Sequence, residues 1–526
     1  MTAASDPTTA PATDANSTEP PTPPAPSASP SPGQSHAAAG VLYGLKLFGA
    51  SLMIATLISL VFSPRFVLWN GLHIPEAWSY PEVNRAVPAL QQVAHPFTEI
   101  ARVVAVIRWR LLMPIIAHVT GMPDWLYLAL PHLGCLLVLA FVLHIVRRDT
   151  GSWPRAWVAA VIVGGSPWLF TSMGWLAYFD SWLVLAALVA SFVRSRWLLA
   201  IVYLLAPWID ERIIIAAPLC LLVRAAYLYR SEPRPMRIVL LDTAVVAALV
   251  VPYVVARLLL IRGSDNDSAY YVSSTIEVMR TIPLSRFIAG LWFAHRAAWW
   301  FIAAMPVMLW AMRGWRWGVA ADIIVIVTAA ASLMIAGDLS RSLAVLIPAC
   351  LAGLMLLWEQ RRRFADISAA IVVLLTFLLP AQHVVTSFVI PIRSVFHEVE
   401  VLQSPPDEVN PHAHIKVATA AAREGDLGKA LHFVDNAIKL DRAPFATQES
   451  SLDSADIWLA RQVTDTVLAA DPNAPQALLL RARLSDRTGN RAAAVADLER
   501  ALEFAPPDWP DRATADRELT RLQRGG

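Results

Sequence analysis

The nearly continuous apolar run of residues 197–229 constrains the fold most strongly, because it is longer than one membrane span needs. As a single helix it would measure roughly 50 Å, against about 30 Å for the hydrocarbon layer of a bilayer. Pro207 and three consecutive charged residues, Asp210, Glu211 and Arg212, interrupt it near the middle. We therefore expect two short spans that turn back and leave these charges at one membrane face. In the alternative interpretation Asp210 only caps the second span, while Glu211 and Arg212 reach toward water.

Composition extends this prediction to most of the chain. Hydrophobic residues make up 56% of its 526 residues and charged residues 16%, which favours a large membrane domain over a soluble enzyme. The net charge of +2 and the scatter of basic residues between apolar segments speak against a nucleic-acid partner. All three cysteines fall within apolar segments, so neither a disulfide framework nor a thiolate metal site is predicted.

Three parts follow one another along the chain. Residues 1–37 are rich in Pro, Ala, Ser and Thr, and we expect a disordered tail. Residues 41–392 form the predicted transmembrane domain, whose first span, 41–62, lies too far from the start to be a signal peptide. A long outer loop, 63–124, follows that span. Residues 405–526 are charged and Ala-rich, and they form the predicted C-terminal domain.

Apolar segments predict about eleven spans, at 41–62, 125–146, 156–172, 175–193, 197–209, 213–229, 238–261, 287–312, 319–336, 343–358 and 367–390. Residues 97–119 are also apolar, but they contain Arg102, Arg108 and Arg110, which are costly at the centre of a bilayer. We assign this segment to a helix in the membrane interface. The fold class is thus all-α, a polytopic helical bundle.

The arginine-rich loops determine the predicted orientation. With a cytoplasmic N-terminus, the clusters at 147–155, 194–196, 230–237, 313–316 and 361–363 all lie inside, as the positive-inside rule requires. Most acids then lie at the outer face: Asp180, Asp210, Glu211, Asp265, Asp267 and Asp338. This topology predicts a bacterial inner-membrane protein with its C-terminal domain outside the cytoplasm.

The C-terminal domain contains an internal repeat. Residues 425–437 match 489–501, with Gly at the start and Ala at corresponding positions, and Pro472 and Pro506 are 34 residues apart. This pattern resembles tetratricopeptide repeats, whose period is about 34 residues, and residues 454–471 are interpreted as a degenerate copy. The domain is predicted either to bind a protein partner or to pack as a cap on the membrane domain.

The layout as a whole resembles the GT-C class of integral-membrane glycosyltransferases. It shares with them a cytoplasmic N-terminus, a long acidic first outer loop, about eleven spans, outer-face charges and a soluble C-terminal domain. The resemblance implies a polyprenyl-phosphate sugar donor within the membrane lipids. No nucleotide-binding glycine loop, zinc-ligand spacing or nucleophile elbow is found in the sequence, so no metal is assigned and the cofactor is left open.

The resemblance also implies roles for particular residues. The family places an acidic base in the first outer loop, where this chain has Glu76 and Glu82, and Asp210 and Glu211 are the alternatives. Arg212 and Arg341 would hold the donor phosphate. Against this role, Arg341 could instead pair with Asp338 while Asp338 caps the following span.

Two other functions stay open at this stage. A lipid-linked polysaccharide polymerase or ligase is one, although such enzymes usually have a larger late outer loop than residues 262–284 provide. The other is a non-catalytic membrane scaffold that presents the repeats outside the cell.

Overall fold

The structure is a computed structural model that describes residues 32–63, 66, 69, 72, 85–97, 109–228, 235–261, 282, 284–335, 338–385, 389–396, 399, 411–441, 452 and 454–524. The chain divides at Lys46 into two compact units. The first unit contributes the start of helix α1 (Pro32–Val61), which begins inside the predicted tail, and the second holds every other element. The candidate bases Glu76 and Glu82 lie outside the described residues.

The fold is mainly helical, as predicted. Among the described residues, five helices are long and apolar enough to cross a membrane, or six if one bent pair is counted as a single span: Gly40–Val61, Asp124–Thr150, Arg237–Leu259, Trp315–Met334 and Leu339–Gln360. In the most apolar 18-residue stretch of the last of these, 94% of the residues are buried, against 22% in that of Arg237–Leu259. Leu339–Gln360 is thus central to the bundle, and α11 (Pro235–Ile261) is peripheral.

The other predicted spans are short or broken helices. Helix α6 (Trp153–Gly164) and α7 (Pro167–Gly174) meet at an angle of 71° before Pro167. Helix α8 (Asp180–Phe192) has 13 residues. The run that ends in Tyr229 gives α9 (Arg196–Leu205), a 3₁₀ turn η3 (Ala206–Trp208), α10 (Arg212–Val223) and a π-helical turn η4 (Arg224–Leu228). The break predicted around Pro207 is therefore present.

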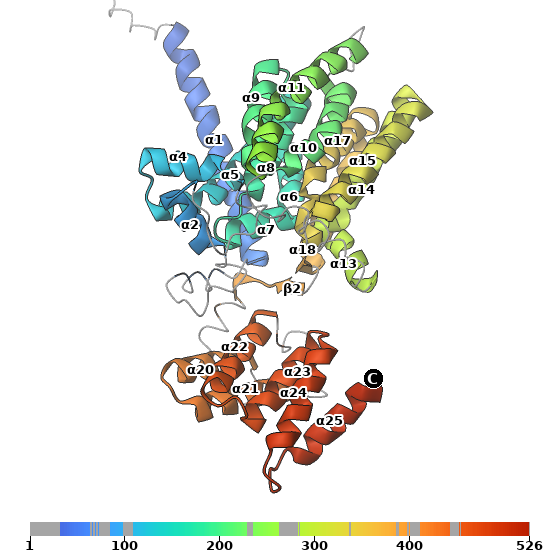
Figure 1. The fold of residues 1–526 in the computed structure, drawn as a ribbon. Coiled ribbons are helices and arrows are strands. Elements are labelled where there is room, and N and C mark those ends of the chain that lie inside the picture. The colour runs from blue at the N-terminus through green and yellow to red at the C-terminus, as the bar shows by residue number, and fades with distance from the viewer. Residues whose placement is uncertain are drawn as a thin grey trace, which may run out of the picture. The chain divides into compact units, whose positions relative to one another are not determined.

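Helices of the bundle pack closely in pairs. Helix α14 (Trp299–Arg313) packs on α15 (Trp315–Ile335) and α17 (Ile347–Gln360), and α5 (Asp124–Thr150) on α6 and α8 (Figure 1). A Cβ added at Gly353 of α17 would lie 1.9 Å from the Phe301 carbonyl oxygen of α14. Only glycine permits this approach, which is typical of helix contacts in membranes. The three cysteines are buried and unpaired.

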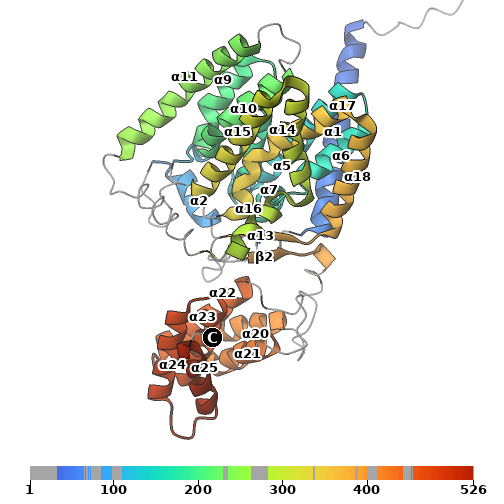
Figure 2. The ribbon, with the colours of Figure 1, turned by 90° about the vertical axis from the view of Figure 1, so that its right-hand side faces the viewer.

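The last predicted span, 367–390, extends too far, because its final residues are not helical. Helix α18 (Arg362–Leu378) stops before Pro380, and a hairpin of β1 (Ala381–Val384) and β2 (Val389–Ile392) follows, with Ala381 opposite Ile392 (Figure 2). Proline cannot continue a helix, and the β-branched residues that follow it suit strands. The hairpin packs against α13 (Leu284–His295) and α16 (Leu339–Ser342).

The described residues between 411 and 524 form six helices: α20 (Pro411–Arg423), α21 (Leu427–Asp441), α22 (Ser454–Ala470), α23 (Pro475–Arg487), α24 (Arg491–Phe504) and α25 (Arg512–Arg524). Gly425 and Gly489 take positive φ in the turns before α21 and α24. The matched alanines of the two repeat copies, Ala430 and Ala494, are both fully buried. The copies thus have equivalent local structures.

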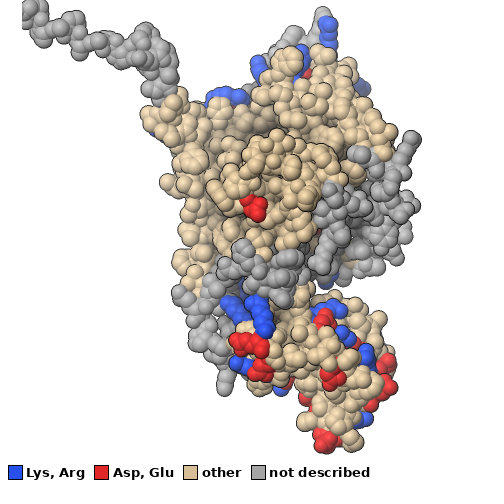
Figure 3. Space-filling view, turned by 60° about the vertical axis from the view of Figure 1, so that its left-hand side comes forward, with Lys and Arg blue, Asp and Glu red and all other residues tan. Residues whose placement is uncertain are grey.

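The surface of the bundle differs from that of the C-terminal helices. Figure 3 shows a broad face of the bundle with few charged side chains, whereas the C-terminal helices carry acidic and basic residues side by side. Large apolar side chains such as Leu258, Ile326 and Leu374 are exposed on the bundle. An exposed apolar surface of this extent fits contact with lipid.

Candidate functional site

The charged residues of the broken run are buried, although the sequence predicted them at a membrane face. Asp210, Glu211 and Arg212 expose 2%, 7% and 1% of their surfaces. Together with partners from other elements they form what we call the charge cluster: Arg110, Asp180, Asp210, Glu211, Arg212, Asp338 and Arg341.

Local backbone structure fixes the Asp210–Arg212 pair. The chain leaves η3 and restarts as α10 at Arg212, whose backbone N–H donates to Asp210 Oδ1 over 3.0 Å. The Arg212 guanidinium donates to the same carboxylate, with Nε to Oδ1 at 2.9 Å and Nη2 to Oδ2 at 2.7 Å. Asp210 therefore binds Arg212 through both its backbone N–H and its side chain. The N-cap position of α10 is Glu211, without a side-chain cap, and both Glu211 and Arg212 are buried, so the alternative interpretation is wrong.

Asp180 is the centre of the cluster. It is the first residue of α8 and is 2% exposed. Its Oδ1 accepts a hydrogen bond from Arg212 Nη2, and its Oδ2 accepts one from Arg341 Nη1 at 3.1 Å. The two arginines predicted to hold a phosphate are thus brought together, on a shared carboxylate.

Asp338 connects the cluster to the hairpin. Its Oδ1 accepts a hydrogen bond from the Arg341 backbone N–H at 3.0 Å and caps α16, and its Oδ2 lies 2.9 Å from Arg341 Nε. The predicted structural pairing of Asp338 with Arg341 is confirmed. His383 of β1 reaches the same Oδ2 with Nε2 at 3.1 Å, and its Nδ1 lies 3.1 Å from Ser340 Oγ.

Arg110 borders the cluster and is its most exposed member. Its side chain is 17% exposed, and its Nη1 and Nη2 lie 2.9 Å from Asp210 Oδ2 and 3.2 Å from Glu211 Oε1. It lies just before α4 (Leu112–Thr120), in the segment predicted as an interfacial helix. Residues 98–108 of that segment, with Arg102 and Arg108, lie outside the described residues.

The cluster is close to electrically balanced. Its three arginines face four carboxylates, which leaves one negative charge. Arg85 supplies the fourth cation, because its guanidinium lies 4.0 Å from the Tyr178 ring centre and that of Arg341 lies 4.6 Å from the same centre. Such mutual compensation makes the burial of most of these charges tolerable.

Neighbouring charges also set the protonation of the carboxylates that precede the helix starts. Burial alone would raise the pKa of Asp210, but Arg110 and Arg212 lower it below its ordinary value. Burial likewise would raise the pKa of Asp338, whereas His383 and Arg341 lower it to about 2. Both residues are therefore ionised at neutral pH.

Four buried polar atoms of the cluster have no hydrogen-bond partner among the described residues. Three are donors, Arg110 Nε, Arg212 Nη1 and Arg341 Nε, although the last lies at ion-pair distance from Asp338, and one is an acceptor, Glu211 Oε2. Buried polar atoms are normally paired, and unpaired ones in a native site often face a ligand or water. The cluster therefore retains capacity to bind an anionic group and a hydroxyl.

Other buried ion pairs lie apart from this cluster. Arg224 at the start of η4 pairs with Asp242 of α11 at 3.0 Å, and Arg196 pairs with the same carboxylate at 2.9 Å. Arg224 also donates to the carbonyls of Ala190 and Val193 at the end of α8. This pair joins helix ends and needs no ligand to explain it.

In comparisons with known proteins, the chain matches no family model, no curated protein and no solved structure.

Proposed function

We propose that this protein is an integral-membrane glycosyltransferase of the cell envelope, which moves a sugar from a polyprenyl-phosphate donor to an acceptor on the extracytoplasmic side. The observation that carries the proposal is the charge cluster. It lies at one end of an apolar helical bundle. It contains arginine N–H donors and a carboxylate oxygen that have no hydrogen-bond partner among the described residues. Transfer from a lipid phosphate requires both kinds of group.

Each group has a role in the proposed reaction. Glu211 Oε2 accepts the proton of the acceptor hydroxyl, whose oxygen forms a bond to the anomeric carbon of the donor sugar. The bond from that carbon to the phosphate oxygen breaks, and the polyprenyl phosphate leaves with the electron pair. Arg110 and Arg212 stabilise its charge through Nε and Nη1, and Arg341 adds positive charge beside them.

Glu211 is a better base than Asp210 on this geometry. Both oxygens of Asp210 are engaged by Arg110 and Arg212, and its pKa is lowered. A carboxylate held in this way gains little by taking a proton. Glu76 and Glu82 stay candidates from the sequence, and Arg102 and Arg108, just before Arg110, supply further positive charge for a phosphate.

The proposal includes the predicted topology of about eleven crossings, with the N-terminus in the cytoplasm and a tetratricopeptide-like domain outside. The span Leu339–Gln360 supports it, because Arg341 of the cluster lies in its first turn and the arginines at 361–363 follow its last. Its 22 residues correspond to roughly 33 Å of helix, about the thickness of the hydrocarbon layer. The cluster then lies at the outer face and the arginine triplet at the inner face.

The proposal is tested by Glu211→Gln, which keeps the size of the side chain but removes its basicity. We expect normal abundance in the membrane and a loss of transfer of about 10²- to 10⁴-fold, seen as failure to complement a deletion strain. Glu359→Gln is the matched control, since it makes the same change at an exposed glutamate outside the cluster. Full complementation by Glu211→Gln would exclude this residue as the base.

A further inference from the structure

Arg85 lies beside the charge cluster without a carboxylate of its own. It immediately precedes α2 (Ala86–Ala94), in the predicted first outer loop, and its side chain is partly buried. Arg110, Arg212 and Arg341 are each bound by carboxylates, but no ion pair and no side-chain hydrogen bond involves Arg85 in the part of the chain that the structure describes. Its N–H donors are therefore available to a ligand.

The ring of Tyr178 holds Arg85 in place. The guanidinium of Arg85 lies over this ring, 4.0 Å from its centre, and that of Arg341 lies 4.6 Å from the same centre. Attraction between a cation and the face of a ring uses none of the N–H donors of the guanidinium. Arg85 is thus positioned by Tyr178 and can still bind a carboxylate or a phosphate through two N–H groups.

The backbone that carries Tyr178 is strained. Ala177, the preceding residue, has a φ of 61°, in the left-handed region that alanine rarely adopts. Strain of this kind persists where the surrounding structure requires it, and it is common at ligand sites. The strained turn brings Tyr178 to Arg85 and, at the start of α8, Asp180 to Arg212 within one short segment.

Burial makes an uncompensated charge at Arg85 costly. It lowers the pKa of Arg85 to about 10, and the positive charges of Arg341 and Arg110 contribute to the decrease, while Asp180 opposes it. The guanidinium of Arg85 still carries its charge at neutral pH. A bound anion would supply the missing partner and remove much of this cost.

The proposed donor phosphate has arginines of its own. Arg110 and Arg212 both contact Asp210 Oδ2, at 2.9 and 2.7 Å, and each keeps one donor atom without a hydrogen-bond partner among the described residues. Arg85 makes no ion pair with Asp210 and is held by Tyr178 instead. Arginines that are held by different anchors are suited to two separate anions.

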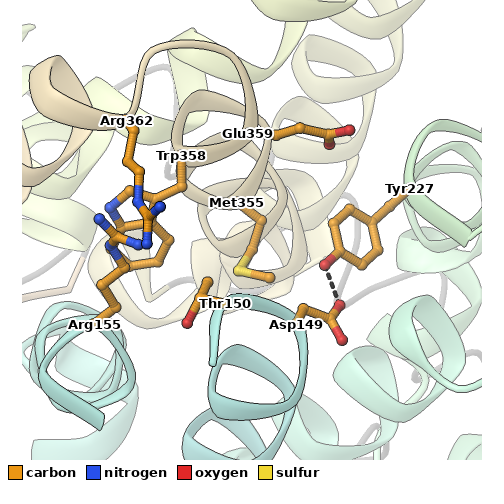
Figure 4. A pocket seen from close by; sticks show the side chains of 8 residues that line it. All are labelled: Asp149, Thr150, Arg155, Tyr227, Met355, Trp358, Glu359 and Arg362. Carbon is orange, nitrogen blue, oxygen red and sulfur yellow. Dashed lines mark hydrogen bonds between the residues drawn. The ribbon is translucent and has the colours of Figure 1, made fainter. Parts of the chain in front are cut away.

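The polar pocket at the other end of the span Leu339–Gln360 shows the contrast with Arg85. Arg155 lines this pocket, and its Nε and Nη2 donate to Asp366 at 2.8 and 2.6 Å. Tyr227 donates to Asp149, another lining residue (Figure 4). The guanidinium and the carboxylate of this pocket are thus engaged by the chain itself.

We propose that Arg85 binds an anionic group of the acceptor, a carboxylate or a phosphate, while the acceptor hydroxyl approaches Glu211. A polyprenyl donor reaches the cluster through the lipid, whereas Arg85 belongs to a loop predicted to lie outside the bilayer. The inference rests on the glycosyl transfer proposed above and specifies its substrate, since it makes the acceptor an acidic molecule.

The test is ligand binding to the purified full-length protein in detergent. Three sugars that differ at one carbon are titrated: glucose, glucuronate and the glucose phosphate that is esterified at that carbon. We expect the two anionic sugars to bind about tenfold more tightly than glucose, the order of one charge-assisted hydrogen bond. Undecaprenyl phosphate is titrated separately as the probe of the donor site.

Variants assign the preference to Arg85. Arg85→Gln is expected to remove the preference for anionic sugars and to leave both the affinity for undecaprenyl phosphate and the thermal stability unchanged, because no carboxylate loses a partner. Arg85→Lys keeps the charge and should retain part of the preference. Arg363→Gln is the matched control, since it makes the same change at an exposed arginine outside the cluster.

Three results would overturn the proposal: equal binding of the three sugars by the parent protein, a preference that survives in Arg85→Gln, or a loss of undecaprenyl phosphate binding in that variant, which would assign Arg85 to the donor. Failure of the proposed transfer gives a different result. Selective binding of anionic sugars without any binding of undecaprenyl phosphate would support anion binding by Arg85 and contradict the proposed donor.

Discussion

Buried arginines in this protein are compensated in two ways. In the charge cluster, Arg212 and Arg341 share Asp180, so their charges are neutralised by carboxylates. Arg296 is 1% exposed and binds carbonyl oxygens instead, those of Gly165, Thr376 and Leu379, close to the ends of α6 and α18. Carbonyls at helix ends carry partial negative charge, which makes them suitable partners for a cation. The carbonyl contacts of Arg296 join helix ends. The charge cluster, in contrast, also contains polar atoms that have no hydrogen-bond partner among the described residues.

Arg212→Gln is expected to lower the free energy of unfolding by about 3 kcal/mol, because it removes one partner each from the buried carboxylates of Asp180 and Asp210. Adding Asp210→Asn to this variant should restore part of the lost free energy, because one of the two carboxylates that have lost Arg212 is then neutral. Thermal unfolding of the purified variants measures both effects. A single variant as stable as the parent would show that the pairing contributes little.

Arg110→Gln separates phosphate binding from stability better than changes at the fully buried arginines. Arg110 is 17% exposed, and Asp210 keeps Arg212 as a partner when it is removed. If Arg110 holds the donor phosphate, turnover should fall about tenfold to hundredfold at normal abundance. Normal turnover in this variant would remove Arg110 from the proposed phosphate site.

Part of the cluster could be predicted from the sequence. Three adjacent charges within an apolar run are conspicuous, and Asp338 and Arg341 stand three apart before another such run. The central position of Asp180 could not be predicted, because only the packing of α8 on α10 brings it to Arg212. His383 could not be predicted for a different reason, since it lies at the end of the predicted span 367–390, where the helix has stopped and strand β1 begins.

At the scale of elements, hydropathy located the apolar segments but not their helix lengths. Residues 287–312, predicted as one span, form α13, a 3₁₀ turn η5 (Arg296–Ala298) and α14, with Arg296 at a φ of 47°. Such a break depends on tertiary contacts of Arg296, which no local pattern reveals. The break before Pro167, in contrast, has a local cause in proline.

The contact of α14 with α17 gives a prediction at this scale. Gly353→Ala places a Cβ 1.9 Å from the Phe301 carbonyl oxygen and must force the two helices apart. We expect a loss of about 1–3 kcal/mol in the free energy of unfolding, measured by thermal unfolding in detergent. Gly49→Ala is the control, because an added Cβ there meets nothing within 4 Å. Equal stability of the two variants would contradict the close packing.

For the whole molecule, the orientation predicted from arginines places the charge cluster on the outer side of the membrane and the arginines at 361–363 on the inner side. An alkaline-phosphatase fusion after residue 400 should be active, and one after Arg363 should be inactive, because the enzyme folds only outside the cytoplasm. An inactive fusion after residue 400, with a cytoplasmic reporter active there, would invalidate the orientation and the site assigned to the outer face.

The central claim is that the charge cluster binds the phosphate of a polyprenyl lipid, and a cryo-electron microscopy structure with added polyprenyl phosphate tests it most directly. The account predicts phosphate density within hydrogen-bonding distance of Arg110 Nε and Arg212 Nη1, two of the three arginine donors of the cluster that have no hydrogen-bond partner among the described residues. The lipid chain should run along the apolar surface of the bundle. A phosphate bound elsewhere, with both donors still without a ligand, would contradict the account.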